Sequence, residues 1–126
     1  MARYRLAATA LEQIGGILDW SEEQFGAHAR ERYEELLLTA MQDVADTPKR
    51  ANVTWMRLTR MEIGVYHIAH SRERASDPPG IVGEPRHYLV FRVGQDGVVD
   101  VLGFVHERML LNRALRKIVR SESAKT

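Results

Sequence analysis

The sequence predicts a single α+β domain in which a two-helix hairpin packs on an antiparallel β-sheet, with an additional short helix near the C-terminus. A chain of 126 residues has room for one modest core. Its first part shows two segments with helical periodicity, and its later part shows three segments rich in Val, Ile, Tyr and Phe. The domain is expected to span residues 1–120, followed by a polar tail at 121–126.

The N-terminal segment predicts a short strand and then a helix. Residues 4–6 have the composition of a strand, and Thr9 with Glu12 has the spacing of a capping box, which predicts a helix beginning there. An apolar stripe follows at helical spacing, formed by Leu11, Ile14, Ile17 and Leu18. Phe25 and Gly26 end the helix, because glycine readily adopts the left-handed conformation of a helix C-terminus.

A second helix is predicted immediately afterwards, ending at Asp46-Thr47-Pro48. Its apolar residues recur at intervals of three and four: Ala29, Tyr33, Leu36, Leu37, Ala40 and Val44. Two amphipathic helices joined by so short a connection must lie antiparallel, with one face each to bury. Trp20 and Tyr33 are interpreted as core residues, because aromatic residues beside a leucine stripe more often pack than bind.

The strands that cover this hairpin are predicted at residues 61–68, 87–93 and 98–105. Asp96-Gly97 predicts a two-residue type I′ turn between the last two. The segment 71–85 is interpreted as a polar arm that attaches to the domain without joining its core. A short basic helix is expected at 110–119. Its cations, Arg113, Arg116, Lys117 and Arg120, indicate a solvated face or, as the alternative, a contact with nucleic acid.

The net charge of +1 conceals an uneven distribution. Residues 7–46 carry nine acidic side chains and two arginines, a net charge of −7, whereas residues 47–126 carry fourteen basic and eight acidic side chains, a net charge of +6. The acidic part is interpreted as an ordinary solvated helical surface. The basic part is suited to nucleic acid or to an acidic protein partner.

Other features exclude several classes of function. The chain has no cysteine, which removes thiol nucleophiles, disulfides and iron–sulfur ligation. No apolar run approaches the length of a membrane span, and the N-terminus does not resemble a signal peptide. We therefore expect a cytoplasmic protein with no membrane contact, no cofactor and no metal.

Several sequence phrases occur in an order that is typical of one family. Tyr4-Arg5-Leu6, Trp20, Phe25-Gly26 and Ala29 with Tyr33 resemble the ParE toxins of the RelE/ParE superfamily. His67-Ile68-Ala69-His70-Ser71-Arg72, the run from Pro85 to Val93 and Val105-His106-Glu107-Arg108-Met109 resemble a ParE-like subgroup with a long arm between two strands. The resemblance covers residues 4 to about 116. It departs at Leu110, where family members often carry an aspartate, so any role of that acid is absent.

This resemblance implies a RelE/ParE-like fold and a toxin of a type II toxin–antitoxin system, neutralised by direct binding of a cognate antitoxin. Within the ParE toxins the implied target is DNA gyrase. The same fold also hosts RelE-type endoribonucleases that cleave messenger RNA on the ribosome, so the fold alone does not choose between the two activities. Direct contact with nucleic acid stays open.

The strand pattern predicts a cluster of cationic and titratable groups at one end of the sheet. A two-residue turn at Asp96-Gly97 sets His87 opposite His106 on a shared face. The adjoining strand ends bring further residues to the same end. The expected cluster is His70, Arg72, Arg86, His87, His106 and Arg108, with Arg92 further along the hairpin.

Three main interpretations of this cluster compete, and a zinc site formed by its three histidines is disfavoured because no carboxylate or cysteine completes the ligand set. In the first, the arginines anchor the arm through Glu84 and Asp77, and the histidines cap strand ends. In the second, an acidic antitoxin segment or the target binds the surface formed by His70, Arg72, Arg86, Arg92, His106 and Arg108. In the third, His87 or His106 transfers a proton at the ribose 2′-OH while Arg86 or Arg108 stabilises the phosphorane charge. Growth inhibition through a protein target is favoured, with ribonuclease activity as the alternative.

Overall fold

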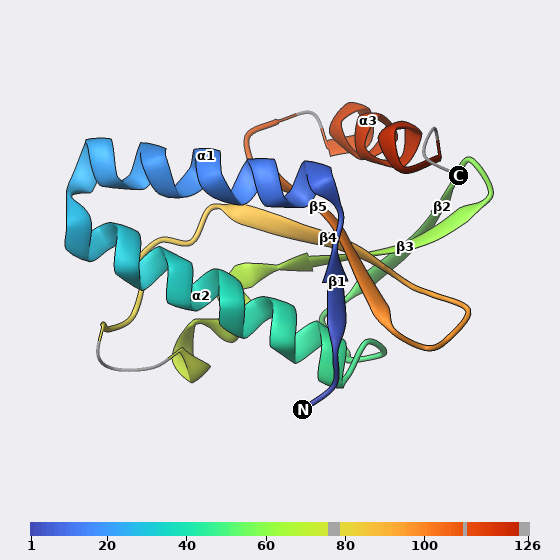
Figure 1. The fold of residues 1–126 in the computed structure, drawn as a ribbon, viewed down its shortest axis with the longest axis horizontal. Coiled ribbons are helices and arrows are strands. Elements are labelled where there is room, and N and C mark those ends of the chain that lie inside the picture. The colour runs from blue at the N-terminus through green and yellow to red at the C-terminus, as the bar shows by residue number, and fades with distance from the viewer. Residues whose placement is uncertain (76–78, 110, 124–126) are drawn as a thin grey trace.

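The computed structural model describes residues 1–75, 79–109 and 111–123. The elements are β1 (Tyr4–Leu6), α1 (Ala8–Phe25), α2 (Ala27–Asp46), β2 (Thr54–Leu58), β3 (Met61–His67), the 3₁₀ helix η1 (Ile68–Arg74), β4 (His87–Val93), β5 (Val99–His106) and α3 (Leu111–Ser123). The strands form one sheet in the order β1-β5-β4-β3-β2, in which β1 is parallel to β5 and the other pairs are antiparallel. The expected α+β fold is confirmed (Figure 1).

Helices cover both faces of the sheet. The antiparallel hairpin of α1 and α2 packs on one face, where Leu36 of α2 and Phe91 of β4 are fully buried in the larger core cluster. Val90, the residue before Phe91 in β4, points to the opposite face and packs with Leu115 and Ile118 of α3. This alternation along β4 gives the domain two cores separated by one sheet. Among the described residues, no helix is both long and apolar enough to cross a membrane.

The start of α1 differs from the prediction. The helix begins at Ala8 after Ala7, whose side chain forms no capping hydrogen bond. Thr9 instead hydrogen-bonds through Oγ1 to the Ser121 hydroxyl, 3.1 Å away, and so ties α1 to α3. The predicted capping box of Thr9 and Glu12 is therefore wrong. Leu11, expected in the apolar stripe, is 61% exposed, because α1 packs through Ala10 and Leu18.

The two helices meet at Gly26, as expected from the sequence. Its φ of +93° is positive, but its ψ of 177° is extended, so it does not adopt the left-handed helical cap. The Gly26 amide donates to the Glu22 carbonyl at 2.8 Å, and its own carbonyl accepts from the Arg30 amide at 3.2 Å. One residue thus ends α1 and starts α2, which is why the hairpin is so tight.

Strand β2 was not predicted. It pairs with β3 through a turn in which Thr59 and Arg60 have φ values of 51° and 65°. Such left-handed pairs usually contain glycine or asparagine, and neither is present here. The usual sequence signal of a hairpin is therefore missing, although the turn itself forms.

The β4–β5 hairpin has the predicted pairing but a different turn. Gly97 donates to the Gly94 carbonyl at 2.9 Å, and Gly94 donates to the Val98 carbonyl at 2.8 Å, which leaves a three-residue loop. Within the described residues of this loop, only Gly97 has a positive φ, so the predicted type I′ turn is wrong. A bulge at Leu102 of β5, opposite the step from Val90 to Phe91, shifts the register back and sets His87 opposite His106.

The segment expected as an arm begins inside the fold. Strand β3 ends at His67, and η1 carries the chain onto α2. Ser71 is fully buried, donates to Asp43 Oδ2 at 2.6 Å, and accepts from the Tyr66 hydroxyl at 2.7 Å. Pro85 at the other end is buried too. The interpretation of 71–85 as an attachment is therefore wrong at both ends, and Asp77 lies outside the described residues.

Helix α3 extends further than expected. It continues to Ser123, so residues 121–123 are helical although they were assigned to the polar tail. Ser121 contacts Thr9, and Glu122 lies 3.5 Å from Arg92 Nη2. These contacts explain why the helix does not end at residue 119.

Candidate functional site

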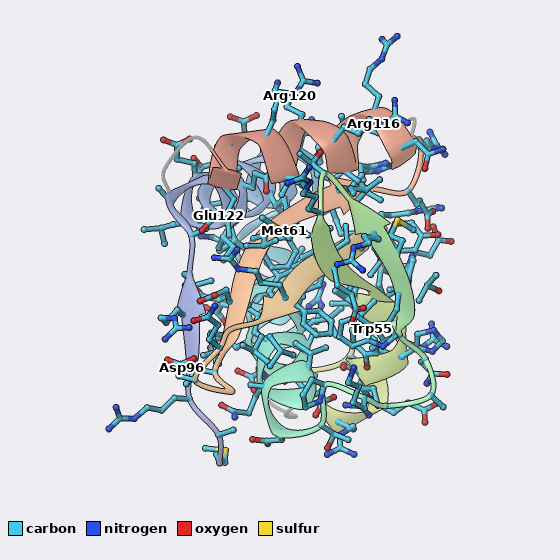
Figure 2. All side chains as sticks on the ribbon, turned by 90° about the vertical axis from the view of Figure 1, so that its right-hand side faces the viewer. Trp55, Met61, Asp96, Arg116, Arg120 and Glu122 are labelled. Atoms are coloured by element: carbon cyan, nitrogen blue, oxygen red, sulfur yellow. The ribbon has the colours of Figure 1, made fainter. Side chains whose placement is uncertain are left out.

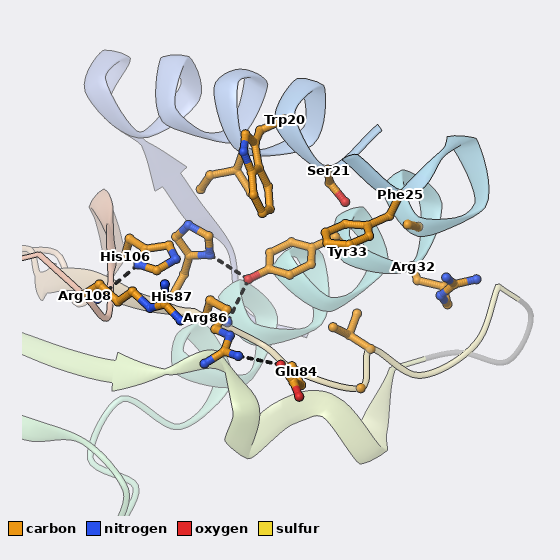
Figure 3. Close-up of a pocket in the computed structure, with 14 residues that line it drawn as sticks. Trp20, Ser21, Phe25, Arg32, Tyr33, Glu84, Arg86, His87, His106 and Arg108 are labelled. Atoms are coloured by element: carbon orange, nitrogen blue, oxygen red, sulfur yellow. Dashed lines mark hydrogen bonds and ion pairs between the residues drawn. The ribbon is translucent and has the colours of Figure 1, made fainter. Parts of the chain in front are cut away.

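A pocket of about 510 Å³ lies where the helical hairpin meets the adjoining ends of β4 and β5 (Figure 3). The helices contribute Ile17, Trp20, Ser21, Phe25, Ala29, Arg32 and Tyr33 to its lining. The sheet and the segment before β4 contribute Val82, Gly83, Glu84, Arg86, His87, His106 and Arg108. Apolar side chains from the helices thus face cationic and titratable groups from the sheet.

His87 and Tyr33 form a buried hydrogen-bonded pair at the inner wall. The Tyr33 oxygen lies 2.6 Å from His87 Nδ1 and accepts the Arg86 backbone amide at 3.1 Å. Among the described residues, His87 Nδ1 is the only acceptor within hydrogen-bond distance of the Tyr33 hydroxyl, so the hydroxyl donates to Nδ1 and the imidazole proton resides on Nε2. Burial lowers the pKa of His87 to about 4 and raises the pKa of Tyr33 to about 12. Both groups are therefore neutral near pH 7.

His106 lies against His87, with ring centroids 5.1 Å apart and ring planes at 85°. Its Nδ1 accepts the Arg108 backbone amide at 3.1 Å, so its neutral ring also carries the proton on Nε2. Both histidines use Nδ1 for a contact within the chain. In its neutral form, each presents only an N–H donor to the pocket.

Arg86 is neutralised by two carboxylates. Its Nη1 donates to Glu107 at 2.7 Å and its Nη2 donates to Glu84 at 2.5 Å. Glu107 also accepts from His67 Nε2 at 2.9 Å, and these two hydrogen bonds, that from Arg86 foremost, lower its pKa to about 2. This network joins the ends of β3, β4 and β5 to the segment before β4. The contact with Glu84 agrees with the interpretation that arginines anchor this segment.

The helical wall of the pocket carries exposed aromatic residues. Trp20 is 52% exposed and Phe25 is 69% exposed, and their rings meet edge to face with centroids 5.7 Å apart. Arg32 and Arg108 also line the pocket, and neither forms an ion pair with a carboxylate in the described part of the chain. The surface therefore combines apolar area with two cations available to a ligand.

Comparison with protein families identifies the chain. The model of the family described as "ParE toxin of type II toxin–antitoxin system, parDE" matches residues 4–111. The chain belongs to the ParE toxin family. It is thus similar over most of its length to toxins of type II toxin–antitoxin systems, and the membership implies an antitoxin partner. Comparison with curated proteins found no match.

The fold of this ParE-family toxin brings together four of the residues expected in one cluster. Arg86, His87, His106 and Arg108 line the pocket. Their convergence follows from the register that pairs His87 with His106.

Two residues of the expected cluster, His70 and Arg72, do not line the pocket, whereas Arg92 lies further along the hairpin as expected. Because η1 leads the chain away from the sheet, His70 packs against Tyr66, with ring centroids 5.7 Å apart. Arg72 donates to the Gly83 carbonyl at 3.2 Å. Arg92 lies further along β4 and pairs with Asp100 at 3.2 Å and with Glu122 on α3. The expectation that His70 and Arg72 join the cluster is therefore wrong.

Sequence reasoning missed Glu107 and His67, and it assigned Trp20 to the core. Glu107 is the only carboxylate between Asp100 and Glu122 and stands between His106 and Arg108, which is a signal that it neutralises neighbouring cations. Tyr33, 9% exposed, is buried as expected. Within residues 1–75, 79–109 and 111–123, no group of three or more His, Asp or Glu side chains is placed to hold a metal ion.

Proposed function

We propose that this toxin inhibits growth by binding a protein target through the pocket surface, that the target is DNA gyrase, and that a cognate antitoxin neutralises the toxin by direct contact. The observation that carries the proposal is the fixed hydrogen bonding of the pocket histidines. His87 and His106 both use Nδ1 within the chain, and the pKa of His87 is about 4. A general base needs a free lone pair and a pKa near the working pH.

The electrostatics of the pocket also favour a protein ligand over a phosphate. Arg86, the cation nearest to His87 in sequence, is already paired with Glu84 and Glu107, and those carboxylates repel a phosphodiester. The exposed rings of Trp20 and Phe25 are typical anchors of protein interfaces. DNA gyrase as the target rests on the resemblance to ParE toxins.

The alternative is a ribosome-dependent endoribonuclease in which His87 or His106 transfers the proton and Arg108 contacts the phosphate. Its supporting observation is the close approach of the two imidazoles beside Arg108, a cation that forms no ion pair with the described residues. Such an enzyme loses roughly 10²- to 10⁴-fold in rate when its proton-transfer residue is removed.

Two assays on the purified toxin separate these functions: supercoiling by gyrase, and messenger RNA cleavage on translating ribosomes. We expect inhibition of supercoiling and no cleavage. The Arg108→Glu variant is expected to weaken inhibition by roughly five- to tenfold, because the reversed charge opposes an acidic partner. His106→Gln is expected to change it at most a few-fold.

The matched control is Arg3→Glu, which reverses an exposed charge outside the pocket. It is expected to leave inhibition unchanged. The proposal would give way to the alternative under two results together. These are messenger RNA cleavage by the wild-type toxin that His106→Gln abolishes, and no effect of the wild-type toxin on supercoiling.

A further inference from the structure

The outer face of α3 carries a stripe of cations. Arg113, Arg116, Lys117 and Arg120 are all exposed, and their spacing of three and four residues puts them on one side of the helix. The other side is apolar and packs against the sheet through Leu115, Ile118 and Val119, which are buried. Figure 2 shows Arg116 and Arg120 projecting away from the body of the molecule.

These charges are not neutralised within the described part of the chain. By contrast, two arginines of the sheet, Arg5 and Arg92, both pair with Asp100. None of the four cations on α3 forms such a pair with residues 1–75, 79–109 or 111–123, and Glu122, the only acidic residue of the helix, is directed to Arg92.

Like charges four residues apart also repel each other along α3. The sequence contains two such pairs, Arg113 with Lys117 and Arg116 with Arg120. Each pair destabilises a helix by about 0.2–0.5 kcal/mol. The toxin therefore keeps an unfavourable charge arrangement that a negatively charged ligand relieves.

The stripe lacks the features of a protein interface or of a membrane anchor. Between residues 112 and 122 no large apolar side chain is exposed. Protein interfaces have an apolar centre that is depleted in charge, and an amphipathic helix on a membrane needs a free apolar face. Helix α3 has already buried that face against the sheet. A regular array of phosphates is the ligand that matches cations alone.

We propose that this face of α3, defined by Arg113, Arg116, Lys117 and Arg120, binds the phosphate backbone of double-stranded DNA without reading its sequence. Arg120 lies seven positions after Arg113, a rise of about 10 Å along the helix. This length is close to the roughly 12 Å width of the major groove between its two backbones. Guanidinium groups match phosphate oxygens well. Because the inner side of α3 is buried, the helix cannot enter the groove deeply, and its contacts stay on the backbone.

This site is separate from the pocket, and the proposal holds whether the target of the toxin is gyrase or another protein. Failure of gyrase inhibition leaves the DNA measurement below unaffected, since that measurement contains no gyrase.

The test is fluorescence anisotropy of a labelled duplex of mixed sequence, titrated with the full-length toxin at several salt concentrations. If the toxin neutralises three to four phosphates, the logarithm of the association constant is expected to fall linearly with the logarithm of the salt concentration, with a slope of about −3. The Arg116→Gln/Arg120→Gln variant is expected to bind at least about tenfold more weakly at low salt and to reduce the slope to about −1 to −2. Circular dichroism checks that this variant is folded.

The control variant is Arg3→Gln/Arg57→Gln, which removes the same charge from exposed positions away from α3. Arg57 alternates with Met56 and Leu58, which pack under α3, and so lies on the opposite face of the sheet. The control variant is expected to retain the wild-type affinity for the duplex within about twofold. Equal losses in both variants would reduce the effect to net charge and overturn the proposal. The proposal is also overturned if the wild-type toxin binds vesicles of anionic phospholipid but no duplex.

Discussion

Arg86 at the inner end of the pocket and the arginines on the outer face of α3 differ in whether carboxylates of the chain neutralise their charge. In the pocket, Arg86 contacts Glu84 and Glu107, and the neighbouring His87 receives a hydrogen bond from Tyr33. On α3, Arg116 and Arg120 face solvent without such partners among the described residues. Polar groups whose hydrogen bonds and ion pairs are formed within the chain hold the fold in place, whereas cations without such partners are available to a ligand. The difference predicts large stability effects in the pocket and small ones on α3.

The largest effect is expected for Tyr33→Phe. Removing the hydroxyl leaves the His87 Nδ1 and the Arg86 backbone amide without their partner. Each unsatisfied buried group costs about 1–3 kcal/mol, so the free energy of unfolding is expected to fall by about 3 kcal/mol. Urea denaturation measures this change.

The matched control is Tyr4→Phe, which deletes a hydroxyl from a half-buried ring that makes no side-chain hydrogen bond to the described residues. We expect a change below about 0.5 kcal/mol, as for surface substitutions. Equal losses in Tyr33→Phe and Tyr4→Phe would contradict a structural role for the Tyr33–His87 pair.

The smallest effect, of opposite sign, is expected on α3. Replacing Arg116 and Arg120 with glutamine removes their mutual repulsion and keeps a similar helix propensity. The free energy of unfolding is expected to rise by about 0.3 kcal/mol at low salt, and the gain is expected to vanish near 1 M salt because charges are screened there. Thermal melts at both salt concentrations measure the difference. A loss above about 1 kcal/mol would indicate that these arginines stabilise the fold.

The pocket could be predicted in part because the sheet register could be predicted. Counting back from a turn at Asp96-Gly97 set His87 opposite His106. The count is correct although the turn has three loop residues, since the bulge beside Val90 compensates for the extra one. Strand alternation and the position of the turn thus constrain which residues lie in the cluster, while the extra loop residue and the bulge offset each other in the register.

Other features had no local signal in the sequence. The Thr59-Arg60 turn lacks the glycine or asparagine that marks such hairpins, so β2 was missed. Helical periodicity alone does not give the exposure of Trp20, whose ring contacts Phe25 near the end of α1. The contact between Tyr33 and His87 joins residues 54 positions apart and depends on packing.

The claim that His87 is a structural residue of the pocket and moves no proton is tested most directly by nuclear magnetic resonance on its ring nitrogens. Burial, together with the nearby His106, lowers the pKa of His87 to about 4, and Tyr33 fixes its proton on Nε2. We predict the Nε2–H tautomer and no titration between about pH 5 and 8. In Tyr33→Phe, the tautomer preference is expected to weaken. A pKa of His87 between about 6 and 7, or a proton on Nδ1, would contradict the account and favour a role in proton transfer.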